Sequence, residues 1–150
     1  MAIQIGDKLP NFKATKQDGT AFDSQEVNHK PVVIYFYPKD FTPGCTTQAC
    51  SFRDAYQDFQ DLGAEVIGIS GDSASSHQNF QQKYKLPFIL LSDADRKLRR
   101  LFGVPTALFG LLPGRVTYVF DAKGFCIYIF DSMSAKNHIE RALKAIQKAK

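Results

Sequence analysis

The chain has 150 residues, of which 44% are hydrophobic and 23% charged, and this length suffices for one domain, 1–150, with its own core. The net charge of +4 comes without a basic arm or a nucleic-acid-binding motif. No apolar run approaches the roughly 20 residues of a membrane span. Partners are therefore expected to include neither nucleic acid nor a membrane.

The N-terminal residues lack the basic and apolar regions of a signal peptide. Three cysteines are too few, and odd in number, for a secreted disulfide framework. We therefore expect a cytoplasmic protein, or one of the plastid stroma or lumen if a transit peptide has been removed. In such a reducing compartment, neighbouring cysteines are more often catalytic or metal-binding than structural.

The first half of the chain predicts alternating strands and helices. A small hairpin is expected from residues 12–15 and 20–22 around Asp18-Gly19. Residues 32–37 are β-branched or aromatic throughout, which is typical of a strand buried on both faces. A helix follows from Thr46 to a cap at Gly63, then a strand at 65–70 and a helix from Asp72 or Ser73 to about Lys85.

The second half predicts a short strand at 88–91 and a short helix at 93–102. In that helix the basic run 96–100 is expected to face solvent, with Leu98, Leu101 and Phe102 inward. Residues 102–114 are rich in glycine and proline and are expected to form a loop. A strand–turn–strand pattern at 115–130 predicts a hairpin, and 138–148 a terminal helix.

This order predicts an α/β fold, with a mixed central sheet flanked by helices. It is compatible with a thioredoxin-like core that carries an N-terminal β-hairpin extension. In a sheet of this type, reaction sites lie beyond the carboxyl ends of the strands, where the next helices begin.

Cys45 is predicted to lie at such a position, in the first turn of the helix after the strand 32–37. Free backbone N–H groups and the helix dipole favour the thiolate there, which is the nucleophilic form. Thr42 is close enough in the chain to hydrogen-bond the sulfur, Pro43 stiffens the loop, and Gly44 permits close approach to the backbone.

Cys50 follows five residues later on the same predicted helix. On an ideal helix this spacing separates the α-carbons by roughly 8–9 Å. A disulfide needs less than about 7 Å. The two cysteines can therefore bond only if the first turns of the helix unwind, which favours a pair that closes during a reaction cycle.

Other interpretations of the cysteines have less support. A structural metal site lacks ligands, because only His29, His77 and His138 are available and no zinc-type spacing is present. A hydrolase would need a histidine base beside Cys45, and nothing in the sequence places one there. No metal and no cofactor are expected.

The stretch 37–45, YPKDFTPGC, contains the P-x-x-x-T-x-x-C motif of peroxiredoxins, which are thiol-dependent peroxidases on a thioredoxin-like fold. Its continuation through Asp54 resembles the Q-type subgroup, also called bacterioferritin-comigratory proteins. The similarity extends through 6–12, 66–70, 86–88 and 114–121. The loop 108–114 resembles the plant and cyanobacterial branch.

The resemblance implies roles for five residues. Cys45 is the peroxidatic cysteine and becomes a sulfenic acid, and Cys50 resolves it to a Cys45–Cys50 disulfide. Thr42 hydrogen-bonds the peroxide and the thiolate, Pro38 shapes and dries the pocket, and Arg115 holds the thiolate and polarises the peroxide. The implied partners are a hydroperoxide substrate and thioredoxin or a similar dithiol reductant. An intramolecular bond needs no second chain, so a monomer is expected.

Three residues need separate comment. Many relatives carry glutamate where this chain has Gln48, so an acidic role at that position is in doubt. Cys126 lies at an alternating position of the predicted hairpin and is expected in the core. Arg53 is expected to pair with a nearby acid on its helix.

Two other functions use the same cysteines. A protein thiol–disulfide oxidoreductase usually carries C-x-x-C, so the C-x4-C spacing argues against it. A redox switch or sensor, in which helix unwinding exposes a partner surface, would need the same residues as the peroxidase. The sequence alone does not separate the peroxidase from the switch.

Overall fold

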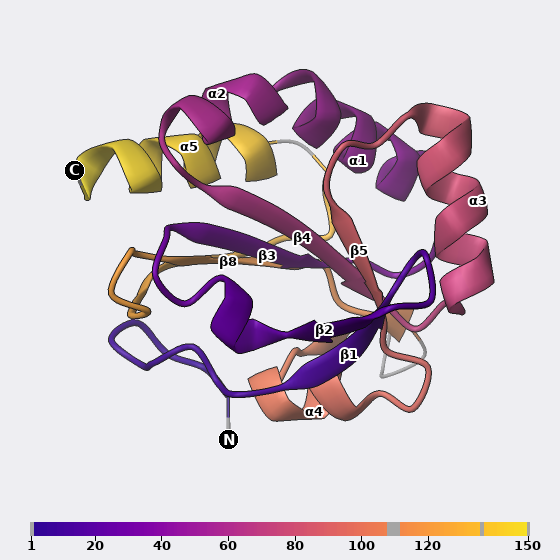
Figure 1. Ribbon diagram of the computed structural model, residues 1–150, viewed down its shortest axis with the longest axis horizontal. Coiled ribbons are helices and arrows are strands. Elements are labelled where there is room, and N and C mark those ends of the chain that lie inside the picture. Colours follow the sequence, from indigo (N-terminus) through magenta and orange to yellow (C-terminus); the bar gives the residue numbers. More distant parts are fainter. Residues whose placement is uncertain (1, 108–111, 136, 150) are drawn as a thin grey trace.

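A seven-stranded mixed sheet organises the molecule (Figure 1). The computed structural model describes residues 2–107, 112–135 and 137–149. The strand order across the sheet is β2-β1-β5-β4-β3-β8-β9. Its strands are β1 (Lys13–Lys16), β2 (Ala21–Asp23), β3 (Val32–Phe36), β4 (Glu65–Ser70), β5 (Ile89–Ser92), β8 (Val116–Phe120) and β9 (Cys126–Asp131).

The central strands β3, β4 and β5 are parallel, and the hairpin β8–β9 adds to β3 in the antiparallel direction. The N-terminal hairpin β1–β2 is confirmed, and its strand β1 pairs with β5. The predicted extension is therefore part of the main sheet. The α/β, thioredoxin-like class with a mixed sheet is also confirmed.

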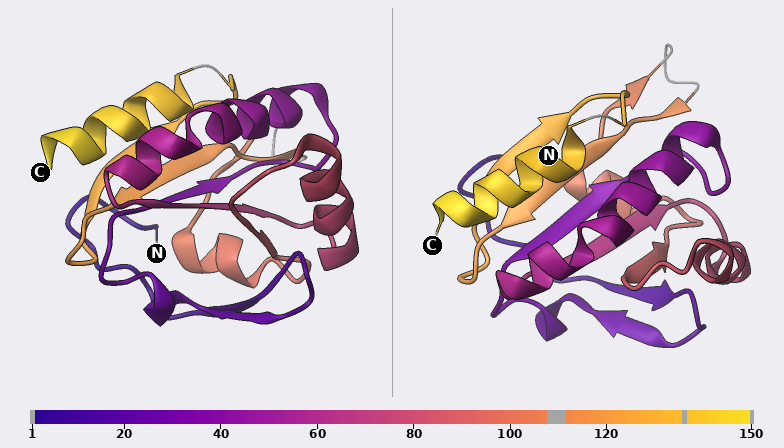
Figure 2. Two further views of the ribbon diagram at one scale, coloured as in Figure 1. Left: turned by 45° about the horizontal axis from the view of Figure 1, so that its top comes forward. Right: turned by 90° about the horizontal axis from the view of Figure 1, so that it is seen from above.

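Helices cover both faces of the sheet (Figures 1 and 2). They are η1 (a 3-10 helix, Ser24–Glu26), α1 (Pro43–Asp54), α2 (Tyr56–Asp61), α3 (Ala74–Tyr84), α4 (Lys97–Phe102) and α5 (His138–Lys148). Figure 2 shows α1 and α5 side by side over the sheet. No helix in the described part of the chain is both long and apolar enough to span a membrane.

Strand β3 shows why two cores form. Its side chains alternate between the faces, so Ile34 and Phe36 join one hydrophobic cluster, and Val33 and Tyr35 join the other. The first cluster lies under α4 and the N-terminal hairpin, and the second lies under α1, α2, α3 and α5. Every residue of β3 is buried, as the unbroken apolar run predicts.

Some predicted boundaries were wrong. The first helix begins at Pro43 instead of Thr46, since proline suits the first helical position, and the helix is interrupted at Ala55. The predicted loop 102–114 contains two short paired strands, β6 (Thr106–Ala107) and β7 (Leu112–Pro113). The resemblance drawn from loop 108–114 falls partly on residues 108–111, which lie outside the described residues.

The basic helix α4 also differs from its prediction. Leu98 and Phe102 are buried as expected, but Leu101 is 38% exposed. Arg99 is buried instead, with its guanidinium 3.5 Å from the carbonyl oxygens of Tyr37 and Gly114. The helix starts at Lys97, because the Asp93 carboxylate accepts the N–H groups of Leu98 and Arg99 from four residues before it.

Candidate active site

Cys45 lies where β3 delivers the chain to α1, at the third residue of the helix. Thr42 precedes the helix in an extended conformation, and its carbonyl oxygen accepts the N–H of Thr46 over 2.8 Å. No side chain caps the helix start. The first N–H groups of α1 and the positive end of its dipole therefore remain available to an anion at Cys45.

Arg115 reaches Cys45 from the other side of the site. Its Nη2 lies 3.4 Å from the Cys45 Sγ, and both residues are buried, at 5% and 1% exposure. Its Nε donates to the Met133 carbonyl oxygen over 2.9 Å, and its Nη1 donates to the Gln48 Oε1. A Cβ on Gly44 would lie 3.1 Å from Nη2, so glycine permits this approach.

In the part of the chain that the structure describes, the hydrogen bonds of Arg115 go to two neutral oxygens and to the cysteine. Among the residues that the structure describes, Arg115 forms no ion pair with a carboxylate. Gln48 supplies an amide oxygen, and its buried Nε2 has no hydrogen-bond partner among the described residues. The Cys45 sulfur thus lies beside a buried guanidinium that has no carboxylate partner among the described residues.

Tyr35 adds a further buried hydroxyl on the same face of the sheet. Its ring stacks on Phe52 of α1, and its oxygen has no hydrogen-bond partner in the described chain. Burial, and then the neighbouring Cys45, raises the pKa of the Tyr35 phenol well above its usual range. Tyr35 thus stays neutral and keeps its proton.

Thr42 and Pro38 are the remaining predicted site residues, and both are half-buried in the loop before α1. The Thr42 hydroxyl donates to the Lys39 carbonyl oxygen over 2.8 Å, in place of the predicted contact to the sulfur. The hydroxyl oxygen can still accept a hydrogen bond, and rotation about one bond redirects its proton.

Cys50 lies on α1 with Cys45, is half-buried, and carries a free thiol. An intact helix with two free cysteines is the reduced arrangement that the spacing predicts. Cys126 is 1% exposed in β9 and belongs to the cluster on the opposite face of the sheet. Burial raises the pKa of its thiol to about 11, and its predicted core position is confirmed.

His138 holds the segment whose carbonyl oxygen binds the Arg115 side chain. The Thr117 hydroxyl of β8 lies 2.7 Å from the His138 Nδ1, and the His138 Nε2 lies 2.9 Å from the Ser132 carbonyl oxygen. Ser132 precedes Met133, whose carbonyl accepts from Arg115. His138 therefore fixes the segment that orients the guanidinium, which the sequence did not predict.

A second set of polar side chains lies before Cys45, around Asp40 and His77. Asp40, Asp72 and His77 are close enough together to hold a metal ion. Their ligand atoms, however, already face hydrogen-bonding partners, including Tyr37, Ser70 and Ser76. Arg53, as predicted, pairs with an acid, Asp54, over 3.0 Å.

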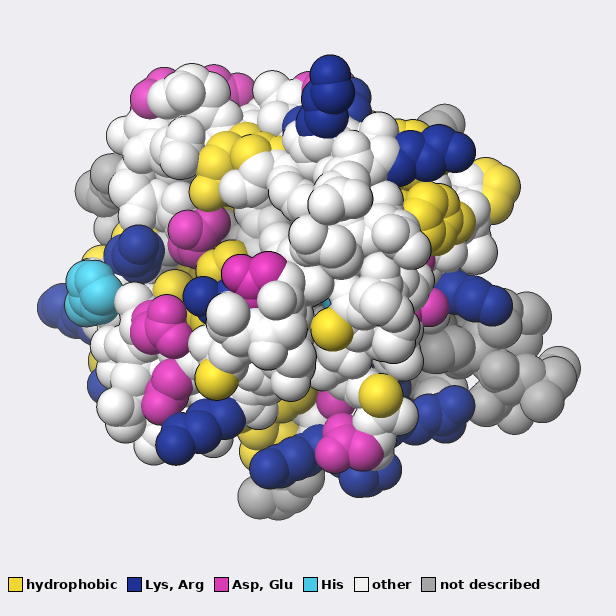
Figure 3. Space-filling view, turned by 45° about the vertical axis from the view of Figure 1, so that its right-hand side comes forward, with side chains coloured by type: hydrophobic (Ala, Val, Ile, Leu, Met, Phe, Trp, Pro, Cys, Tyr) yellow, Lys and Arg dark blue, Asp and Glu magenta, His cyan; other side chains and the backbone are white. Residues whose placement is uncertain are grey.

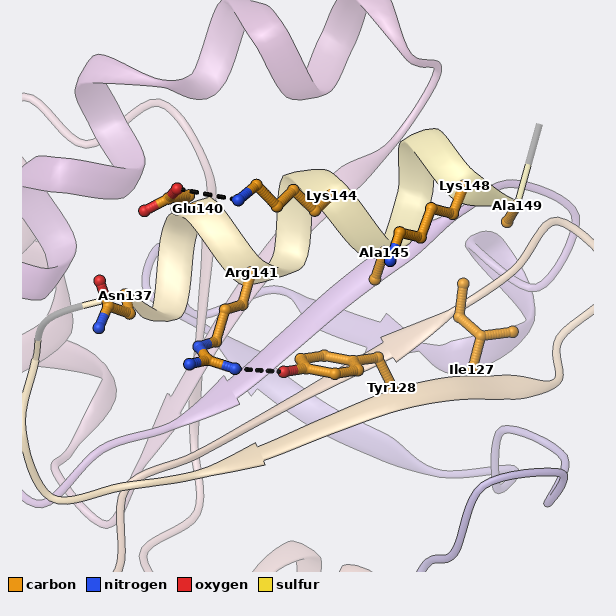
Figure 4. A pocket seen from close by; sticks show the side chains of 9 residues that line it. All are labelled: Ile127, Tyr128, Asn137, Glu140, Arg141, Lys144, Ala145, Lys148 and Ala149. Atoms are coloured by element: carbon orange, nitrogen blue, oxygen red, sulfur yellow. Dashed lines mark hydrogen bonds and ion pairs between the residues drawn. The ribbon is translucent and has the colours of Figure 1, made fainter.

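A cavity of about 570 Å³ lies away from the cysteines, between α5 and β9 (Figure 4). Arg141 donates to the Tyr128 hydroxyl there, and Lys144 pairs with Glu140. On the face with α3 turned forward, basic and acidic side chains are interspersed without forming a broad basic stripe (Figure 3). Neither feature connects with the chemistry at Cys45.

Comparison with known proteins agrees with the fold and the site. The model of the AhpC/TSA family matches residues 5–129, and the chain belongs to this family. It is 54% identical over 146 residues to peroxiredoxin Q, chloroplastic, of Oryza sativa subsp. japonica, covering 97% of this chain and 67% of that protein. The corresponding Arabidopsis thaliana protein is 50% identical over 148 residues, covering 98% and 68%.

Solved structures lead to the same class. Peroxidoxin BcpB of Mycobacterium tuberculosis superimposes with a TM-score of 0.90 at 32% identity, covering 99% of each chain. A cysteine-to-serine mutant of Xanthomonas campestris peroxiredoxin Q gives 0.86 at 31% identity, covering 93% of this chain and 92% of that one. The chain is thus a thiol-dependent peroxidase, most similar among these relatives to peroxiredoxin Q.

Proposed function

We propose that Cys45 is the peroxidatic cysteine and Cys50 the resolving cysteine of a cycle that reduces hydrogen peroxide and small alkyl hydroperoxides. The contact between the Arg115 Nη2 and the Cys45 Sγ is the observation that carries the proposal. It places a buried cation on a thiol at a helix N-terminus, a combination that favours the nucleophilic thiolate.

In the first step the Cys45 thiolate attacks the terminal oxygen of the hydroperoxide. The S–O bond forms as the O–O bond breaks, and the departing oxygen leaves as water or an alcohol after taking a proton. Negative charge develops on that oxygen, so fixed donors accelerate the step. Arg115, the open N–H groups of α1 and the Thr42 hydroxyl are the donors at hand.

In the second step the Cys50 thiolate attacks the Cys45 sulfenic sulfur and releases water, which leaves a disulfide. Because both cysteines lie on α1, the helix must unwind between them first. Thioredoxin or a similar dithiol then reduces the disulfide by exchange and returns both thiols. The reaction thus converts one hydroperoxide and one dithiol into an alcohol or water, water and a disulfide.

Pro38 is assigned a supporting role. It follows β3 and Tyr37 and is half-buried at the start of the loop, where its apolar ring offers no N–H donor to water. The Xanthomonas campestris bacterioferritin comigratory protein, at 30% identity, is described as having alkyl peroxide reduction activity, which supports organic hydroperoxides as substrates. Location remains a prediction, and the plant relatives are named chloroplastic.

Stopped-flow peroxide consumption with thioredoxin and its reductase tests the assignment. Cys45→Ser should abolish turnover, because the nucleophile is lost. Cys50→Ser should undergo one oxidation and then recycle poorly, because no disulfide forms. Cys126→Ser is the matched control and should turn over like the unaltered protein, since Cys126 lies on the other face of the sheet. Turnover by Cys45→Ser at the original rate would refute the proposal.

The same assay separates the peroxidase from a redox switch. A peroxidase completes many cycles for each molecule when the reductant is renewed. A switch would oxidise once and stop. Hydrogen exchange of residues 43–50 should also increase on oxidation, because the disulfide requires that the start of α1 is unwound.

A further inference from the structure

The loop between β3 and α1 contains one buried carboxylate. Asp40 is 3% exposed, although Lys39 and Phe41 on either side of it are exposed. Its Oδ1 accepts the Tyr37 hydroxyl over 2.6 Å, and its Oδ2 accepts the Ser76 hydroxyl over 2.9 Å. The His77 Nδ1 lies 2.6 Å from the same Oδ2. A carboxylate this well satisfied is costly to displace.

His77 is fully buried and connects the loop to the sheet. Its Nε2 lies 2.9 Å from the Leu91 carbonyl oxygen, which can only accept, so this nitrogen carries a proton. Its Nδ1 faces the Asp40 carboxylate. The pair therefore bridges the loop to β5.

The backbone of Asp40 is held as well. Its N–H donates to the Asp72 Oδ2 over 2.8 Å, and the Ser70 hydroxyl donates to the same oxygen over 2.5 Å. Ser70 ends β4, and Asp72 follows it shortly before α3. These attachments lie just after β3, on β4 and the turn that follows it, on α3 and on β5, and none of them lies on α1, the helix that must unwind.

The residues that follow Asp40 depend on this attachment. Phe41 adopts a left-handed backbone conformation, with φ of 65°, which costs roughly 1 kcal/mol for a residue other than glycine. Such a conformation persists only where the surroundings hold it. The Thr42 hydroxyl donates to the carbonyl of Lys39, which belongs to the peptide group whose N–H Asp72 accepts. Fixing Asp40 therefore fixes the position of Thr42.

We propose that Asp40 and His77 are positioning residues that hold the catalytic loop, and with it Thr42, in the reactive geometry while α1 unwinds and rewinds. This role rests on the proposed function of Cys45. Neither residue touches the reacting atoms. Unwinding then begins after Thr42, and the loop that ends at Thr42 keeps its conformation until the helix forms again.

Two substitutions of His77 separate its two contacts. In His77→Asn the amide nitrogen takes the place of Nδ1, keeping the Asp40 contact and losing that to Leu91. In His77→Gln the amide nitrogen takes the place of Nε2 and keeps only the contact to Leu91. Each variant loses one buried hydrogen bond, so both should lose similar stability. His29→Gln, at an exposed histidine, is the control.

The readout is the rate of Cys45 sulfenate formation with hydrogen peroxide in a Cys50→Ser background, measured by quenched flow and mass spectrometry. We expect His77→Gln to be at least roughly tenfold slower, since small displacements of a positioned group have effects of this size. His77→Asn should remain within about threefold of the reference. Hydrogen exchange at the Asp40 amide should accelerate in His77→Gln and stay slow in His77→Asn.

Equal slowing of the two variants, or no slowing in folded His77→Gln, would overturn the inference. If His77→Gln does not fold, Tyr37→Phe and Ser76→Ala each remove one donor to Asp40 and serve in its place, judged by the same rate. The proposed function fails in a different way, through turnover by Cys45→Ser. The two failures are therefore distinguishable.

Discussion

The two sides of the Cys45 site are built around buried histidines with different partners. His77 faces the Asp40 carboxylate, so the loop before Cys45 is held by a pair in which the carboxylate has a partner. His138 faces the Thr117 hydroxyl and the Ser132 carbonyl, which are both neutral, on the side that orients Arg115. The buried charged group of the loop side thus has a partner, whereas the buried guanidinium of Arg115 has no carboxylate partner among the described residues and lies against the sulfur.

This difference indicates that the loop side fixes the position of the catalytic loop, whereas the arginine side supplies positive charge at Cys45. The Asp40–His77 pair restrains the loop through hydrogen bonds to α3 and β5, and none of these bonds involves the Cys45 sulfur. A neutral histidine orients the Met133 segment without competing with the guanidinium for the thiolate. If this comparison holds, changes on the arginine side should affect the chemical step more than changes on the loop side.

The largest effect is expected from Arg115→Met, which removes the charge and keeps much of the bulk. Cys45 oxidation should slow by about 10²–10³-fold, the typical effect of removing one fixed donor to a developing negative charge. Stopped-flow rates in the Cys50→Ser background measure this step. Arg141→Met, at an exposed arginine of α5, should be unaffected. If the oxidation rate of Arg115→Met fell no further than that of His77→Gln, the proposed difference between the two sides would be contradicted.

A smaller effect is expected from Gln48→Glu, which gives Arg115 the carboxylate that it lacks. The new ion pair competes with the thiolate, so oxidation should slow by about fivefold, which corresponds to roughly 1 kcal/mol. The hydrogen bond to Arg115 also becomes one between two charged groups, so the protein should become more stable by about 1 kcal/mol. Urea unfolding and the same kinetic assay measure the two changes. Faster oxidation would show that the uncompensated charge is not what activates Cys45.

Thr117→Val should have a milder effect, because it removes only the hydroxyl that faces His138. We expect about 1 kcal/mol less stability from the lost hydrogen bond and roughly threefold slower oxidation through a less fixed Met133 carbonyl. Ser75→Ala, a change at the exposed start of α3, is the control for hydroxyl loss. An unchanged rate with lowered stability would make His138 purely structural.

The smallest effect is on the pH dependence of stability. Burial, and after it the nearby charge of Arg115, lowers the pKa of His138 below its ordinary 6.5. The unfolded chain therefore binds a proton near pH 6.5 that the folded protein refuses, and stability falls as the pH drops through 6.5 toward the lower folded value. Urea unfolding at pH 7.5 and 5.5 measures the loss. His138→Gln should show a smaller difference between the two pH values, and an equal difference would exclude His138 as the cause.

The sequence predicted the parts of the fold that depend on local pattern. The apolar run of β3, the turn of the β8–β9 hairpin and the periodicity of α5 each specify an element without reference to the rest of the chain. The short β6–β7 pair was missed, since its strands of two residues carry no period. Arg99 was placed in solvent because nothing local reveals that carbonyl oxygens of distant residues surround it.

The site residues also divide into those that a local motif predicts and those that depend on contacts between distant parts of the chain. Cys45, Cys50, Thr42 and Pro38 lie within one short motif, and the role of Arg115 was implied by the family resemblance. The structure brings Arg115 to the Cys45 sulfur, although its catalytic role remains a prediction. Asp40 with His77, and Thr117 with His138, were not anticipated as pairs. Each pair joins residues 37 and 21 positions apart, and no motif spacing encodes such contacts.

The start of α1 lacks a side-chain cap, because the Thr42 hydroxyl is engaged by Lys39. A missing cap costs a helix about 1 kcal/mol, which multiplies the population with a frayed first turn by about five. The same open N–H groups that can receive the peroxide thus make that turn the easiest one to open. In the proposed cycle, substrate affinity and the frequency of disulfide closure are therefore coupled through one hydroxyl, and a better cap at residue 42 is expected to weaken both.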